Sequence, residues 1–552
     1  NGKVFEDSNF HPIKEITESK FSFDKQEYTW RRIDGFYPVP IFKKESISDT
    51  YIQQGELKDS YFIAALIRIA KQPKLIEKLF DIRTKQNRND SIDLKCGAVI
   101  VYFHIFGRKT PVLIDTLIPF QRGSRTPIFS HPTDNKYSAW FCLVEKAYAK
   151  LQGSYSSITT GTFSQAIYHL FGYYPCQYTI SNLLEKRDKK QNTNSTNDEN
   201  EYLFSNLMKW QYENSVIGTN ISSNQSENDD EIKDNGLITS QTYLVKKVRR
   251  EEGKNFICLR NPKNDHEWLG KWSNTSNLWT CEIKRKLGFE RKNDGTFWMT
   301  DKDFFGYFTN FDVCKPFNPE YHIKSIKTKE GSSQTIVFKI NEINTQTVDG
   351  EKIRLIVEKQ SSEATKILIV YSNGRKIEST EIDQYRHQQF TTSGPVSCFT
   401  FSPLENDTFT IIFEGENSEE IFASFSFKYD FDLFDMEAPN ELAMEDERIG
   451  ILFNNESKRY RNVARKIVTK KIDNKVLNSY NDDSNFLTDP SLNKGSETNF
   501  DFYEYDISDN EEKTPSDTSK YSEIIEKYFG PSSEKKSPSE MLECSLKKLQ
   551  EF

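Results

Sequence analysis

Closely spaced cysteines are absent from this sequence. Its eight cysteines lie far apart, with no Cys-x-x-Cys pair, at positions 96, 142, 176, 258, 281, 314, 398 and 544. A structural zinc site or a disulfide framework needs cysteines at short spacings. We therefore expect reduced, mostly buried thiols and no structural zinc.

Long apolar segments are also missing. No stretch approaches the roughly 18 to 20 residues that a membrane-spanning helix needs. The first residues, Asn-Gly-Lys-Val-Phe-Glu-Asp, contain no hydrophobic core of a signal peptide,. We expect no transmembrane segment and a cytoplasmic protein. The chain does not begin with methionine, so the position of its native N-terminus stays open.

No charge of one sign dominates the chain. Its 74 basic and 82 acidic residues are well mixed and give a formal net charge of -8. This balance creates no field that favours nucleic acid or an anionic membrane, so we expect protein partners and no nucleic acid. One basic run, residues 458–475, suits an acidic polymer such as a microtubule surface or a phosphoinositide patch; the alternative is a solvated face,.

The sequence has no internal repeat and no Asp-x-Asp-x-Asp-Gly calcium loop of the EF-hand kind. At 552 residues, with 36% hydrophobic and 13% aromatic content, it is too long for one hydrophobic core. We expect about three or four domains.

Hydrophobic spacing predicts helices and strands in the first third of the chain. Residues 59–80 have the pattern of a helix with one buried face, interrupted by Pro73, and Asp59 stands at the N-cap position,. The next expected elements are strands at 98–106 and 111–117 and a helix at 140–151.

Two polar tracts interrupt the middle of the chain. Residues 187–201 and 220–235 predict surface loops, with a short helix at 202–208 between them,. Strands at 242–248 and 256–260 then lead into a Trp-rich stretch.

Short alternating runs between residues 321 and 434 predict a β-sandwich. The expected strands are 335–340, 352–359, 366–371, 397–402, 408–414 and 421–431. After residue 436 this order is lost in low-complexity sequence.

The run Gln54-Gly55-Glu56-Leu57-Lys58-Asp59-Ser60-Tyr61 has the form of a cysteine-protease active-site helix with serine at the nucleophile position. Further blocks follow in order: 145–155, Arg260-Asn261-Pro262, Glu267-Trp268 with Gly270 and Trp272, and 294–299. On these blocks the segment from about residue 30 to 314 resembles the protease core of the calpain family.

The resemblance implies an α+β fold. We expect a papain-like two-subdomain calpain protease core, then a C2-like β-sandwich and a low-complexity tail. The expected bounds are 1–201 for the first core subdomain with an N-terminal extension, 202–317 for the second, 318–435 for the sandwich and 436–552 for a partly disordered tail.

Calpain chemistry, as the resemblance implies it, needs Cys, His and Asn brought together across a cleft. Their positions in this chain are Ser60, Gln241 and Asn261, and Gln54 takes the oxyanion position,. A glutamine amide has no usable basicity near neutral pH, and an unactivated hydroxyl is a poor nucleophile. The walls of the expected cleft also differ from the family pattern, because Tyr61 and Lys263 stand where the family has tryptophan. We therefore expect no active catalytic residue.

The leading hypothesis is a calpain-like pseudoprotease that acts as an interaction or scaffold module. Cytoskeletal or axonemal partners, and with them a cytoskeletal or flagellar location, are expected from the resemblance to calpain-like proteins of protists. Two alternatives stay open: a divergent hydrolase that uses Ser60 with another base such as His266, and a regulator that sequesters calpain substrates. Ser60, Gln54 and Asn261 also have ordinary structural explanations as local hydrogen-bonding residues.

The resemblance also implies calcium sites built from loop carboxylates. Glu267 and Asp294 match ligand positions, but other acids are replaced, by Asn274, Thr296, Tyr51 and Ser156. Because calcium affinity depends on the number of carboxylates, we expect no cofactor, or at most one weak residual calcium site at Glu267 and Asp294. Peripheral membrane contact through the sandwich stays open.

Overall fold

A computed structural model describes residues 4–10, 28–35, 37, 48–80, 97–134, 138–191, 199–221, 234–316, 321–327, 333–340, 352–359, 363–371, 386–392, 394–403, 408–415 and 421–435. Most of the 220–235 insertion, the basic run 458–475 and the whole tail from 436 lie outside these residues. Helices and antiparallel sheets are mixed up to residue 315, and the described residues beyond it form strands, which agrees with the α+β class.

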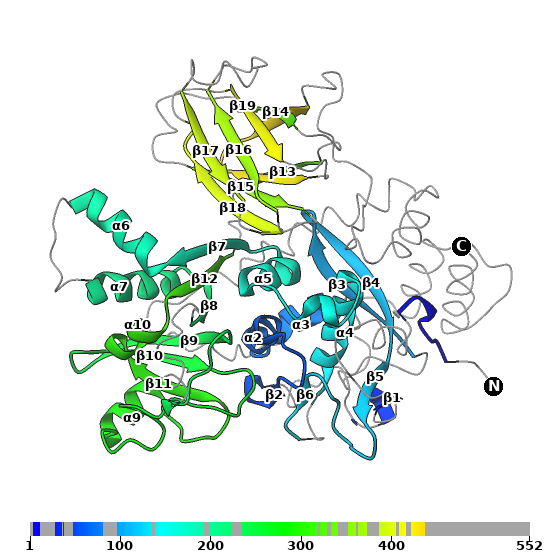
Figure 1. Cartoon of the computed structure of the whole chain (residues 1–552), viewed down its shortest axis with the longest axis vertical. Coiled ribbons are helices and arrows are strands. Elements are labelled where there is room, and N and C mark those ends of the chain that lie inside the picture. Colours follow the sequence, from blue (N-terminus) through cyan, green and yellow to red (C-terminus); the bar gives the residue numbers. More distant parts are fainter. Residues whose placement is uncertain are drawn as a thin grey trace, which may run out of the picture.

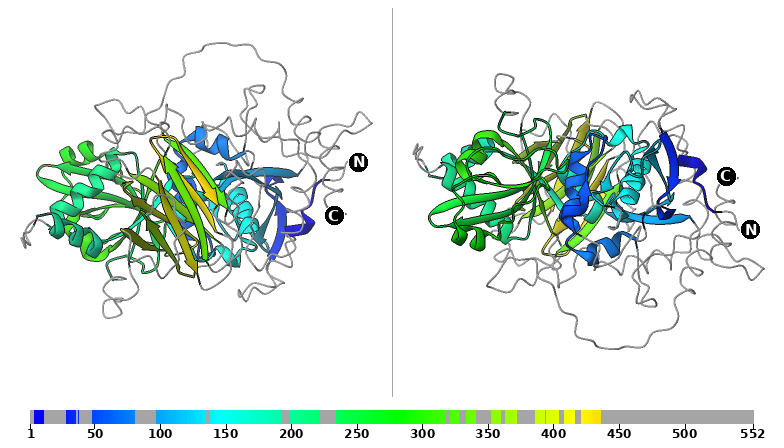
Figure 2. Two further views of the ribbon diagram at one scale, coloured as in Figure 1. Left: turned by 90° about the horizontal axis from the view of Figure 1, so that it is seen from above. Right: turned by 90° about the horizontal axis from the view of Figure 1, so that it is seen from below.

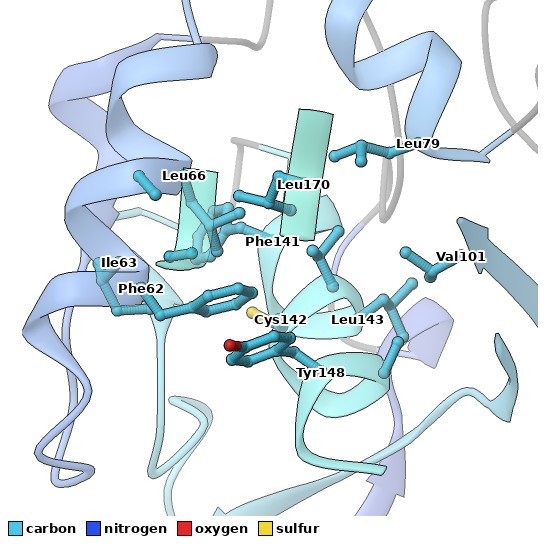
Figure 3. Packing of buried hydrophobic residues seen from close by; sticks show 14 of the residues in the cluster. Phe62, Ile63, Leu66, Leu79, Val101, Phe141, Cys142, Leu143, Tyr148 and Leu170 are labelled. Atoms are coloured by element: carbon cyan, nitrogen blue, oxygen red, sulfur yellow. The ribbon is translucent and has the colours of Figure 1, made fainter. Parts of the chain in front are cut away.

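Two helices form the centre of the first lobe. These are α2 (Ser60–Ile69) and α4 (Trp140–Gln152), whose apolar residues share one core. The rings of Phe62 and Tyr148 stack with their centroids 4.1 Å apart, as Figure 3 shows from close by. Stacked aromatic rings bury a large apolar area, so this contact holds α2 firmly against α4.

The helix expected over 59–80, with an interruption at Pro73, is confirmed as two helices. The first, α2, ends at Ile69, and the second, α3 (Pro73–Phe80), begins at the proline. Proline suits the first position of a helix because the amide it lacks would have no helical partner there.

The other elements of the first lobe are short. Its strands are β1 (Tyr28–Arg32), β2 (Ile52–Gln53), β3 (Ala98–Ile105), β4 (Arg108–Asp115), β5 (Leu117–Gln121) and β6 (His131–Pro132). They pair as β1 with β5, β2 with β6, and β3 with β4. The helices are α5 (Phe163–Phe171) and the 3-10 turns η1 (Ser8–Phe10), η2 (Ile33–Gly35), η4 (Asp49–Tyr51) and η5 (Ser156–Ile158).

The second lobe is a six-stranded antiparallel sheet in the order β11-β10-β9-β8-β12-β7. Its strands are β7 (Tyr174–Thr179), β8 (Val216–Asn220), β9 (Thr242–Glu251), β10 (Lys254–Arg260), β11 (Thr296–Thr300) and β12 (Asn310–Lys315). Its helices are α6 (Ile180–Gln191), α7 (Glu199–Tyr212), α9 (Cys281–Leu287) and α10 (Asp301–Tyr307). Residues from Tyr174 onward, within the segment assigned to the first subdomain, already belong to this sheet.

The loop predicted over 187–201 is wrong at both ends. Helix α6 continues to Gln191, and α7 begins at Glu199, three residues before the helix expected at 202. Lysine, arginine, glutamine and glutamate are good helix formers, so a polar run need not be a loop. Arg187 donates to Glu199 at 3.4 Å and joins the two helices.

The third part of the structure consists of two packed antiparallel sheets, in the orders β13-β20-β15-β18 and β17-β16-β19-β14-β21. Their strands are β13 (His322–Lys327), β14 (Ser333–Ile340), β15 (Ile353–Glu358), β16 (Thr365–Val370), β17 (His387–Thr391), β18 (Val396–Phe401), β19 (Thr408–Gly415), β20 (Phe422–Phe427) and β21 (Phe431–Asp435). Residues from both sheets form one core. The strand expected over 421–431 is in fact two, β20 and β21, and the mostly polar β13 and β17 were not predicted.

The sandwich lies over the junction of the two lobes (Figures 1 and 2). Helix α2 lies below the sandwich, between the lobes. Glu358 at the end of β15 reaches the first lobe, where it accepts hydrogen bonds from Phe106 N at 2.6 Å and Tyr168 Oη at 3.0 Å. Strand β18 contacts β7 of the second lobe. No helix in the described ranges is both long and apolar enough to cross a membrane.

Candidate active site

Ser60, at the expected nucleophile position, is the first residue of α2 and is buried. Its Oγ accepts a hydrogen bond from the backbone N of Thr242 at 3.1 Å. Thr242 begins β9 in the second lobe, so this hydrogen bond crosses from one lobe to the other. The serine side chain therefore stabilises the contact between the lobes.

Gln241, at the expected base position, precedes β9. The preceding residue, Ser240, has a φ of 58°, a left-handed turn conformation that sets the direction of the chain into the strand,. Gln241 Nε2 donates to Gln54 Oε1 at 3.0 Å and to Asn261 Oδ1 at 3.3 Å. The structure thus brings Ser60, Gln241, Asn261 and Gln54 together, although they lie on segments far apart in the sequence.

Gln54, at the expected oxyanion position, uses its amide within the protein. Its Nε2 donates to Leu57 O at 2.7 Å and to Asp59 Oδ1 at 3.4 Å. Its backbone N donates to Pro262 O at 2.9 Å, another link between the lobes. An oxyanion donor has to point at the reacting oxygen. Here both side-chain hydrogens are directed at groups of the protein.

Asn261 is fully buried and holds its own loop. Its Nδ2 donates to His266 O at 3.0 Å, and its Oδ1 accepts from Lys263 N at 3.0 Å. In a Cys-His-Asn arrangement this side chain would orient an imidazole. Here its Oδ1 accepts from the Gln241 amide instead.

His266, the conceivable substitute base, has a half-exposed ring that pairs with Asp265, with Nδ1 and Oδ1 2.9 Å apart. Within the described ranges, no imidazole or carboxylate is hydrogen-bonded to Ser60 Oγ. General-base catalysis requires a base within about 2.6–3.2 Å of the proton that it removes. This arrangement does not provide one for Ser60.

A buried pair of carboxyl groups, Asp59 and Glu145, lies below the site and was not anticipated. Asp59 is the N-cap residue of α2, but its side chain makes no capping hydrogen bond, contrary to the role expected for it. Asp59 Oδ2 is buried without a donor in the described part of the chain, and the carboxyl group faces Glu145. Ser130 Oγ donates to Glu145 at 2.7 Å.

Burial raises the pKa of both acids. For Asp59, burial and the charge of Glu145 raise the pKa well above its ordinary value. For Glu145, burial raises the pKa to about 7. Burial and mutual repulsion disfavour the doubly ionised form of such a pair, so it keeps a proton at a higher pH than two exposed carboxyl groups would. The sequence signal was an acid inside the apolar run Trp-Phe-Cys-Leu-Val-Glu of α4.

An ion pair also joins the lobes beside the site. Lys246 Nζ on β9 lies 2.6 Å from Asp49 Oδ2, and Asp49 is buried. Burial alone would raise the pKa of Asp49, but Lys246 and Lys71 more than offset it, and the pKa lies below its ordinary value. Together with the Ser60 and Gln54 contacts, this pair holds the lobes together.

The candidate calcium ligands Glu267 and Asp294 lie close together, but protein donors already engage them. Glu267 accepts from Gly295 N at 2.8 Å and from Asn274 Nδ2 at 2.6 Å. Asp294 Oδ1 accepts from Thr296 N at 2.9 Å.

A buried guanidinium supplies the positive charge at these carboxylates. Arg260 Nη1 lies 3.4 Å from Asp294 Oδ1, and Arg260 has no exposed surface. Calcium requires six to eight oxygen ligands without a competing cation. The residues present here do not fit a calcium ion. No group of three or more His, Cys, Asp or Glu residues in the described ranges is placed to hold a metal.

Comparison with known proteins gives the family. The family model for calpain family cysteine proteases matches residues 5–315. Human calpain-14 is 29% identical over 324 residues, 57% of this chain and 43% of calpain-14. Calpain-B of Drosophila melanogaster is 29% identical over 329 residues, 57% of this chain and 32% of that protein. Mouse calpain-5 is 28% identical over 310 residues, 53% of this chain and 46% of calpain-5.

The matched region thus spans less than half of each of these relatives. The family match covers the first lobe, the second lobe and every candidate site residue discussed above. With more than half of its length matched, this chain belongs to the calpain family of cysteine proteases.

Proposed function

We propose that this chain is a calpain-family pseudoprotease whose core serves as a protein-interaction or scaffold module. The observation that carries the proposal is the hydrogen bonding of Gln241, which donates to Gln54 and Asn261 where a catalytic imidazole would be needed. Ser60 Oγ accepts from a backbone amide of the opposite lobe. The polar groups at the site thus join the lobes together.

The chemistry supports this proposal because two requirements fail together. A serine hydroxyl needs a base to become a nucleophile, and a glutamine amide does not accept a proton near neutral pH. Loss of one triad member typically lowers kcat by about 10⁴-fold or more. With the Gln54 amide also engaged, oxyanion stabilisation is reduced as well,.

A proteolysis assay on the full chain tests the proposal. Casein and a fluorogenic calpain peptide are incubated with the chain, with and without calcium, beside an active calpain as a positive control. We expect no cleavage above buffer in either condition. Cleavage that disappears in Ser60→Ala would refute the proposal, and labelling of Ser60 by a fluorophosphonate probe would favour the divergent hydrolase.

The proposal also concerns the identity of the β-sandwich and the class of partner. We infer that residues 318–435 form a C2-like domain and that the partners are proteins of the cytoskeleton or axoneme. The two packed antiparallel sheets that follow the calpain-family core support the first part of this inference. The mixed charge of the chain favours protein partners but does not point to one class of them,. Cosedimentation with microtubules tests it. Enrichment of calpain substrates instead, in mass spectrometry of bound proteins, would favour the regulator that sequesters substrates.

A further inference from the structure

Two cysteines meet where the sandwich contacts the second lobe. Cys176 lies on β7, the edge strand of the six-stranded sheet, and Cys398 lies on β18, the edge strand of the four-stranded sheet. Strands β7 and β18 contact one another, and Figure 1 shows β18 directly above β7. Each cysteine is therefore on the strand nearest to the other domain.

The packing around the two cysteines fixes their positions. Cys398 lies opposite Ile356 in the pairing of β15 with β18. Ile356 packs in a small cluster with Tyr168 and Tyr174, and Cys398 packs against that cluster. Tyr174 is two residues before Cys176 on β7, so both side chains point to the same face of the strand,. This apolar cluster packs the two strands against one another.

The two thiols lie close enough for each to be the first influence on the pKa of the other. Both residues are only half-buried. The neighbouring Cys398 thiol, together with Lys315 and Arg354, lowers the pKa of Cys176 below its ordinary value despite burial. Cys176 and burial raise the pKa of Cys398 well above its ordinary value, so Cys176 is the thiol that reacts first. A larger thiolate fraction makes a cysteine more reactive in exchange with disulfides.

We propose that Cys176 and Cys398 form a reversible disulfide that ties the β-sandwich to the protease core. The oxidant is a small-molecule disulfide such as oxidised glutathione. The bond would fix the sandwich on the second lobe while Glu358 holds it to the first lobe. Oxidation would then lock the position of the sandwich over both lobes.

The reaction proceeds by two thiol–disulfide exchanges. The Cys176 thiolate attacks one sulfur of oxidised glutathione, forms a mixed disulfide and releases one glutathione thiolate. The Cys398 thiol then loses its proton, attacks the Cys176 sulfur and releases the second glutathione. The two cysteines lose two electrons and two protons in total, and these appear on two molecules of reduced glutathione.

The other described cysteines provide internal controls. Cys314 is buried on β12 of the same sheet, and burial raises the pKa of its thiol well above the ordinary value. Cys281 is exposed at the start of α9. If exposure alone decided which cysteine is oxidised, Cys281 would react first. If the proximity of two thiols decides it, a disulfide forms between Cys176 and Cys398.

Disulfide mapping of the full chain tests the proposal. The reduced protein is equilibrated in glutathione buffers of increasing oxidised fraction, quenched with acid and an alkylating agent, digested without reduction and examined by mass spectrometry. We expect a cross-linked peptide pair containing Cys176 and Cys398, which rises with the oxidised fraction and disappears on return to reducing buffer. Cys176→Ser and Cys398→Ser should each abolish it, and Cys281→Ser and Cys314→Ser should leave it.

Two results would overturn the proposal. One is separate glutathione adducts on Cys176 and Cys398, or a disulfide from either to a different cysteine. The other is that both remain thiols while Cys281 is modified. Circular dichroism and thermal unfolding of each variant establish that it is folded, and the wild-type titration decides the question even if one variant fails to fold.

Discussion

Gln241 Nε2 donates a hydrogen bond to Gln54 Oε1 at 3.0 Å, and this contact joins the two lobes at the position where catalysis would take place. Gln54 precedes α2 in the first lobe, and Gln241 precedes β9 in the second. The Asn261 side chain accepts from the same Gln241 amide at 3.3 Å. Three amide side chains thus form a structural network at this position.

Replacement of Gln241 by alanine should weaken the contact between the lobes. Gln54 and Asn261 would each lose a donor in a largely buried setting, so we expect a stability loss of about 1–2 kcal/mol. Urea denaturation measures the free energy of unfolding. Gln165→Ala on α5, a half-buried residue of the first lobe, is the matched control and should change stability by less than about 0.5 kcal/mol,. Equal losses in both variants would contradict the expectation.

Restoring the expected nucleophile should require the base as well. Ser60→Cys alone should give a thiol with an ordinary pKa, whereas Ser60→Cys with Gln241→His places an imidazole beside it and favours the thiolate. We expect iodoacetamide at pH 6 to alkylate the double variant roughly tenfold faster.

The double variant Ser60→Cys with Gln241→Asn is the control for repacking around residue 241. It should react at the rate of Ser60→Cys alone. If all three variants were alkylated equally fast, residue 241 would not lie close enough to Ser60 to act as its base.

The raised pKa values of Asp59 and Glu145 should make stability depend on pH. Folding raises the pKa of Glu145 to about 7, so the native state keeps a proton that the unfolded state has lost above pH 4.5. The stabilising contribution is therefore complete below about pH 4.5 and decreases as the pH rises toward 7. Each unit of pKa shift corresponds to roughly 1.4 kcal/mol.

Glu145→Gln removes this titration. Denaturation of wild type and Glu145→Gln at several pH values should give curves that converge or cross, with the variant losing less stability between pH 4.5 and 7. Parallel curves would show that the pair does not hold a proton. Glu290→Gln, at an exposed ion pair with Lys292, is the control and should run parallel to the wild type.

Calcium should not stabilise the wild-type chain. Arg260 already faces Asp294, and Asn274 donates to Glu267, so we expect no change in Tm when millimolar calcium is added. Asn274→Asp replaces that donor with a third carboxylate, which should lower stability by about 1–3 kcal/mol without calcium. Differential scanning fluorimetry compares the two proteins. A calcium-dependent rise in Tm of the wild type equal to that of Asn274→Asp would contradict the expectation.

Local pattern was enough to predict much of the secondary structure. The helices at α2, α3 and α4 and the strands at β9, β10 and β15 follow from apolar periodicity, which depends only on neighbouring residues,. Where periodicity was weak, prediction failed. The polar ends of α6 and α7 were taken for a loop, and their helical state is supported by the tertiary contact between Arg187 and Glu199.

The sequence by itself determined that serine and glutamine occupy positions 60 and 241, and its motif blocks indicated the family. Only the tertiary structure decided how these residues are used: Ser60 with Thr242, Gln241 with Gln54, Asp59 with Glu145, Arg260 with Asp294, and Cys176 with Cys398. Most of these pairs join residues on segments far apart in the chain. Their contacts and pKa values depend on which surfaces pack together and on how much water is excluded, and local sequence does not encode either quantity.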